Sequence, residues 1–67
     1  MMKINFSNNL KLLRTAKKLS QKDLATKMNI TIKTISHWET GYTEPSISQL
    51  VMLSEIFDIS IDDLILN

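Results

Sequence analysis

The sequence predicts an all-α fold of five short helices, and three observations indicate it. Ser or Thr residues followed three positions later by an acidic or amide side chain recur along the chain, as they do at helix starts. No five-residue stretch alternates between apolar and polar side chains as a half-buried strand does. The one Gly and the one Pro lie close together, at Gly41 and Pro45. The 67 residues allow one small core, so residues 1–67 are predicted to form a single domain.

The first two helices can be identified from their apolar spacing and side-chain chemistry. The first extends from about Ser7 to Lys18, with Leu10 and Leu13 on one face. The second begins at Ser20, which can cap the amide of residue 23 in a capping box. The expected helices cover residues 7–18, 20–28, 31–40, 46–57 and 60–66.

The last two helices repeat the same capping chemistry. Ser46 follows Pro45 and is followed by Gln49, which can complete a capping box. Ser60 and Asp63 form the same pattern near the end of the sequence. Both segments are therefore predicted to be helices with well-defined starts.

A very short connection joins the second and third helices. Thr31 can cap the third helix, and only Asn29 and Ile30 separate it from the second. Asn is well suited to the left-handed conformation that ends a helix. Two short helices joined so tightly must cross steeply, which predicts a helix-turn-helix motif over about residues 20–40.

The third helix has two chemically different faces when its residues are placed 100° apart. Ile35 and Trp38 lie on one side and are expected in the core. The other side presents hydrogen-bonding groups, a cation and an aliphatic chain: Ile32, Lys33, Ser36, His37 and Thr40. Such a face fits the major groove of DNA, where donors, acceptors and thymine methyl groups are exposed.

Charge is divided between the two parts of the chain. Residues 1–40 hold all eight cations and two acids, a net charge of +6. Residues 41–67 hold no Lys or Arg and five acids, a net charge of −5. This asymmetry favours a polyanion partner for the first part and a different role for the second.

Several classes of protein are disfavoured by composition. There is no Cys and one His, so no metal site or other cofactor is expected. The longest apolar run is Leu50–Leu53, and the N-terminal residues lack the apolar region of a signal peptide, which predicts a cytoplasmic protein without a membrane segment. His37 and its neighbour Ser36 point in different directions on a helix, and no oriented acid follows, so no enzyme is expected. A chain of 67 residues is too small to predict a ligand pocket, so no small-molecule ligand is expected.

Residues 10–66 resemble the helix-turn-helix domains of the phage Cro and repressor type, also called the xenobiotic-response-element family. The resemblance rests on Leu13-Arg14, Leu19 to Ala25, Ile30-Thr31, Ile35 to Gly41, Pro45-Ser46, Leu50 and Ile59 to Leu64. It implies a five-helix lambda-repressor-like fold whose third helix is the recognition helix. The sequence departs from the family pattern at Asn29, where Gly is usual, and at Ile32, where many members have a polar residue.

The resemblance also implies roles for individual residues. Arg14 and Glu39 match an internal ion pair between the first and third helices. The base-contacting positions match Ile32, Lys33, Ser36 and His37. The phosphate-contacting positions match Ser20, Gln21, Lys22, Thr31, Thr40 and Tyr42.

By the same resemblance, two copies bind double-stranded DNA at a pseudo-palindromic operator. The expected dimer or partner surface is the apolar last helix, with Ile61, Leu64, Ile65 and Leu66. The two recognition helices would lie about 34 Å apart, one turn of duplex. This predicts a transcriptional regulator, a repressor by occupancy, in a bacterial or phage-infected cell. The alternative is an antitoxin-type module that masks a partner protein and binds DNA only to regulate its own gene.

Overall fold

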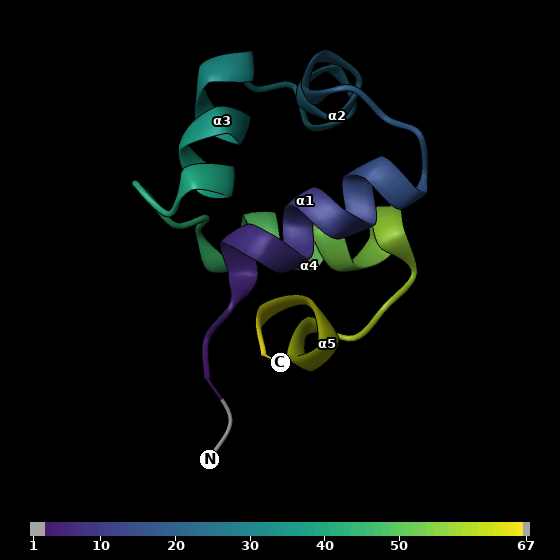
Figure 1. The fold of residues 1–67 in the computed structure, drawn as a ribbon. Coiled ribbons are helices and arrows are strands. Elements are labelled where there is room, and N and C mark those ends of the chain that lie inside the picture. The colour runs from purple at the N-terminus through teal and green to yellow at the C-terminus, as the bar shows by residue number, and fades with distance from the viewer. Residues whose placement is uncertain (1–2, 67) are drawn as a thin grey trace.

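The computed structural model describes residues 3–66, in which five α-helices account for most of the chain. They are α1 (Phe6–Ala16), α2 (Gln21–Met28), α3 (Ile32–Thr40), α4 (Ile47–Phe57) and α5 (Ile61–Ile65). Figure 1 shows α2 and α3 at one end of the molecule and α5 at the other, with α1 between them. The predicted all-α fold and the order of its helices are confirmed.

The core is a single apolar cluster to which all five helices contribute. Trp38 of α3 is 2% exposed, and its ring meets Phe6 of α1 edge to face with 6.2 Å between the ring centres. The buried residues are Phe6, Leu10, Leu24, Ala25, Met28, Ile35, Trp38, Leu53, Phe57 and Leu64. The predicted core positions Ile35 and Trp38 are therefore confirmed.

Side-chain caps define the starts of α2 to α5. The hydroxyl groups of Ser20, Thr31, Ser46 and Ser60 each accept the backbone N–H three residues later. The capping box is complete at Ser20 and Ser46. At Ser60 the prediction of a full box is wrong, because among the described residues no return bond joins its amide to the acidic side chain of Asp63.

Four helices end in the same left-handed turn. Lys18, Asn29, Gly41 and Asp58 have φ of 59°, 57°, 79° and 53°. The residue after each of them donates its backbone amide to the carbonyl five residues earlier, at 2.9–3.1 Å. These donors are Leu19, Ile30, Tyr42 and Ile59. The left-handed Lys18 ends α1 at Ala16, so the prediction that this helix continues to Lys18 is wrong.

The segment before α1 holds the last helix in place. Ile4 and Leu66 form an isolated antiparallel bridge, and the Asn5 amide donates to the Ile65 carbonyl at 2.7 Å. The Asn9 side-chain amide donates to the carbonyls of Leu64 and Leu66 at 3.1 and 2.9 Å. These bonds satisfy carbonyls that the end of α5 leaves without helical partners. Within residues 3–66, no helix has the length and apolar character needed to span a membrane.

Candidate nucleic-acid interface

Helix α3 is anchored by one face and open to solvent on the other. Ile35 and Trp38 are buried, while Lys33 and Thr40 are exposed. Ile32, an aliphatic residue, is 46% exposed. The structure therefore orients α3 as its apolar spacing predicts, with the candidate base-contacting side at the surface.

His37 has a defined neighbour on this open side of α3. Its ring lies 4.8 Å from that of Tyr42, at an interplanar angle of 61°. His37 is half-buried, like Ser36 one residue before it, and Tyr42 is 76% exposed. The Thr40 hydroxyl donates to the His37 carbonyl at 3.2 Å, so its proton is engaged within the helix. The ring contact could not be predicted from helix spacing, because Tyr42 lies beyond the helix in a turn set by Gly41.

The candidate phosphate-contacting groups at the helix starts also have structural roles. The Ser20 hydroxyl accepts the Asp23 amide at 2.9 Å, and the Ser20 amide donates to the Asp23 carboxylate at 2.8 Å. Hydrogen bonds from the backbone and then the side chain of Ser20 lower the pKa of Asp23. Thr31 accepts the Thr34 amide at 3.2 Å, and Lys22 is exposed beside Ser20. Ser20 and Thr31 are both exposed residues, and the Thr31 hydroxyl also shares a hydrogen bond of 2.9 Å with that of Thr34.

The ion pair implied by the family resemblance is present. Arg14 Nε donates to Glu39 Oε2 at 2.6 Å and Arg14 Nη2 to Oε1 at 3.1 Å, while Nη1 donates to the Leu19 carbonyl at 2.7 Å. The two side chains are 11% and 4% exposed. The hydrogen bond to Glu39 raises the pKa of Arg14 above its ordinary value, against the effect of burial. Gln21 also donates its side-chain amide to Glu39 Oε1 at 3.1 Å, a contact that the sequence did not indicate.

The predicted partner surface on α5 needs correction. Leu64 is fully buried, and Ile61, Ile65 and Leu66 are half-buried rather than exposed. The helix has only five residues, and the bonds to Asn9 and Asn5 hold it with Leu64 in the core. The prediction that Leu64 belongs to an exposed partner surface is therefore wrong.

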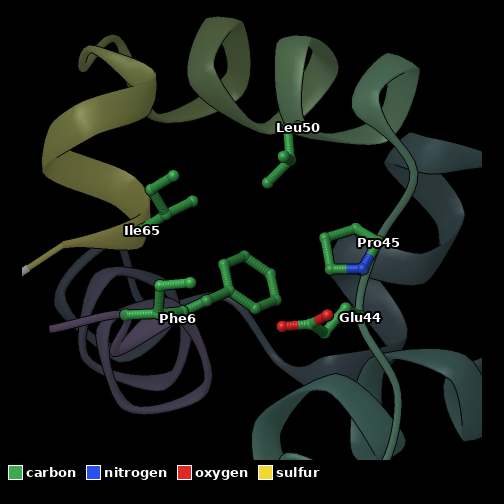
Figure 2. Close-up of a pocket in the computed structure, with 6 residues that line it drawn as sticks. Phe6, Glu44, Pro45, Leu50 and Ile65 are labelled. Atoms are coloured by element: carbon green, nitrogen blue, oxygen red, sulfur yellow. The ribbon is translucent and has the colours of Figure 1, made fainter.

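The larger apolar surface lies on α4 and the N-terminal segment. Ile47 and Val51, four residues apart on one side of α4, are 80% and 43% exposed, and Ile4 is 70% exposed. The spacing of Ile47 and Val51 can be read from the sequence. Because apolar residues occur around most of α4, the sequence did not indicate which of its faces is exposed. Ile4 also lines an open groove of about 170 Å³, whose other lining residues are Phe6, Glu44, Pro45, Leu50 and Ile65. Figure 2 shows Leu50 and Ile65 directed into this groove from two helices.

An exposed helix with hydrogen-bonding side chains, joined to the preceding helix by a tight turn, defines a helix-turn-helix motif. The family model described as Helix-turn-helix matches residues 10–64, and the chain belongs to this family. Its five helices have the lambda-repressor-like fold, as the resemblance implied. The family is one of DNA-binding transcriptional regulators.

Three known proteins illustrate the relationship. The uncharacterized HTH-type transcriptional regulator YqaE of Bacillus subtilis is 42% identical over 60 residues, covering 90% of this chain and 52% of YqaE. The HTH-type transcriptional activator BcrR of Enterococcus faecalis is 36% identical over 62 residues, covering 92% of this chain and 30% of BcrR. The biofilm master regulator SinR, in a crystal structure with DNA, matches with a TM-score of 0.77 and 30% identity, over 87% of this chain and 97% of that one. The chain thus spans about half of YqaE and less than a third of BcrR.

Proposed function

We propose that this protein is a sequence-specific regulator of transcription that binds double-stranded DNA with α3 in the major groove. The observation that carries the proposal is the orientation of α3, whose apolar face is fixed in the core while its polar face is open to solvent. A related structure was determined with DNA bound. The protein acts by binding alone, in the bacterial cytoplasm, without catalysis or a cofactor.

The proposed DNA-contacting side chains divide into two groups by what they contact. We infer that Lys33, Ser36 and His37 hydrogen-bond base edges and that Ile32 contacts a thymine methyl group. A second group contacts phosphates on either side of the groove: Ser20, Gln21, Lys22, Thr31, Thr40 and Tyr42. The Thr40 hydroxyl exchanges its bond to the His37 carbonyl for one to a phosphate oxygen. Phosphate contacts fix the register of the protein, and the base contacts supply sequence preference.

We propose that two copies associate through the apolar surface of α4 and its adjoining groove. Ile47 and Val51 offer exposed aliphatic area there, and no Lys or Arg occurs after residue 40. An acidic, apolar half that avoids DNA leaves the basic half to face the duplex. Symmetric pairing of this kind matches an inverted repeat in the operator.

The dimer proposal is tested by placing a charge on the proposed surface. Ile47→Glu should shift the protein from dimer to monomer in sedimentation equilibrium, because burying an unpaired carboxylate at the interface is costly. Leu12→Glu is the matched control, since Leu12 is another aliphatic residue, 59% exposed, on α1. Equal association of both variants and the wild type would contradict the placement of the interface.

Occupancy of an operator that overlaps a promoter is enough to repress, and we propose repression as the outcome. The DNA-binding proposal is tested by selecting ligands from a random duplex library at about 150 mM salt, where nonspecific binding is weak. Enrichment of an inverted repeat is the expected result. A folded protein that enriches no sequence would contradict the proposal and favour an antitoxin-type role with a protein partner.

A further inference from the structure

The contact between Gln21 and Glu39 joins the first residue of α2 to the last turn of α3. Gln21 Nε2 donates to Glu39 Oε1 at 3.1 Å, and Arg14 donates to both oxygens of the same carboxylate, to Oε2 from Nε and to Oε1 from Nη2. The Glu39 side chain is 4% exposed, whereas Gln21 is half-buried and lies at the edge of the network. A buried, doubly anchored carboxylate therefore holds a side chain that is itself accessible at the surface.

We infer that Glu39 is a positioning residue that holds the Gln21 amide ready to donate to a DNA phosphate. An amide nitrogen has two N–H groups, and the bond to Glu39 engages one of them. The second N–H has no hydrogen-bond partner among the described residues. This inference rests on the proposed phosphate contact of Gln21 and adds the group that orients it.

Arg14 makes a carboxylate tolerable at this position. A lone negative charge beside a phosphate would repel it, and the repulsion would be strong in a partly desolvated interface. The two hydrogen bonds from Arg14 compensate the charge of Glu39, so the pair as a whole is neutral. The carboxylate thus keeps its acceptor geometry for Gln21 while its charge is balanced.

The benefit of this arrangement is preorganisation. A free Gln side chain samples many rotamers, and fixing it on binding reduces affinity. The bond to Glu39 restricts those rotamers before DNA arrives. Removing either the Gln21 amide or the group that holds it should therefore weaken DNA binding, and the two losses should not add.

The test is a double-mutant cycle measured by fluorescence anisotropy with a labelled duplex of the selected operator sequence. One arm changes Gln21→Ala. The other replaces the ion pair by Arg14→Met and Glu39→Met together, which removes the carboxylate without leaving an unpaired buried charge. Melting curves confirm that each variant is folded at the assay temperature. If the Met pair does not fold, Glu39→Asp, which retracts the carboxylate by one methylene group, takes its place.

In the wild-type background Gln21→Ala should weaken binding about tenfold, the loss expected for one hydrogen bond to a charged group. In the Met-pair background the same change should cost twofold or less. An equal loss in both backgrounds would overturn the positioning role. If Gln21→Ala has no effect in the wild-type background, the phosphate contact itself is absent, and this inference fails with it while base contacts by α3 remain open to their own test.

Discussion

Arg14→Ala is the substitution whose effect on stability follows most directly from the structure. The change removes three hydrogen bonds, two to the Glu39 carboxylate and one to the Leu19 carbonyl. Glu39, 4% exposed in the wild-type structure, then keeps only the Gln21 amide as a side-chain donor. The dominant loss is therefore the cost of a buried carboxylate whose cation is gone.

Removing one partner of a buried ion pair costs about 3–5 kcal/mol. Arg14 is 11% exposed, so some water reaches the pair and the lower end, about 3 kcal/mol, is the appropriate value. For a domain of this size each 1 kcal/mol lowers Tm by about 4–8 °C, which gives a fall of about 12–24 °C. That loss is comparable to the whole stability that so small a core supplies, about 3–5 kcal/mol.

The assay is thermal unfolding followed by circular dichroism at neutral pH. Lys11→Ala on the same helix is the control, because Lys11 is exposed and its side chain makes no hydrogen bond in the described residues. Replacing Arg14 and Glu39 together by Met should restore most of the lost stability, since no charge is then left unpaired. A Tm for Arg14→Ala within about 2 °C of the Lys11→Ala value would refute the reasoning.

Three further changes test other parts of the fold. Asn9→Ala should cost about 1–3 kcal/mol, because two hydrogen bonds to the end of α5 are lost, whereas Asn8→Ala, at an exposed neighbour, should melt like the wild type. Gly41→Ala should cost about 1–2 kcal/mol through backbone strain at φ 79°, since there is room for the added methyl group; unchanged urea denaturation would contradict this. Asp23→Asn should lower stability at pH 7, and by less at pH 3. Ser20 lowers the pKa of Asp23, so the ionised form stabilises the fold above the ordinary Asp pKa, about 3.9, and this contribution is lost as the pH falls through the lowered value; a constant difference at both pH values would argue against it.

Local side-chain chemistry explains why the helix starts could be predicted. A Ser or Thr cap acts within three residues, so Ser20, Thr31, Ser46 and Ser60 were identifiable without knowledge of the fold. The helix ends were harder, because Asn29 and Gly41 are common in left-handed turns but Lys18 and Asp58 are not. Lys rarely adopts the left-handed conformation, but at Lys18 the hydrogen bond from the Leu19 amide back to the Arg14 carbonyl outweighs that preference.

Contacts between distant residues could not be predicted in the same way. Asn9 on α1 bonds carbonyls more than fifty residues away, and an exposed-looking Asn in a helix gives no indication of this. The apolar last helix was predicted to carry a partner surface, but Leu64 is buried because α5 packs against α1 and α4. The pattern of apolar residues identified which segments had a face to bury, and only the packing decided where that face lies.

The central claim is that the open face of α3 determines which DNA sequence is bound, and paired selections test it most directly. Wild type and His37→Ala are each used to enrich duplexes from the same random library at about 150 mM salt. We expect both proteins to enrich an inverted repeat, with the variant losing preference at one position of each half-site, since a single side chain contacts one or two base pairs. Identical preferences at every position, with equal affinity, would contradict the assignment of this face to base contact.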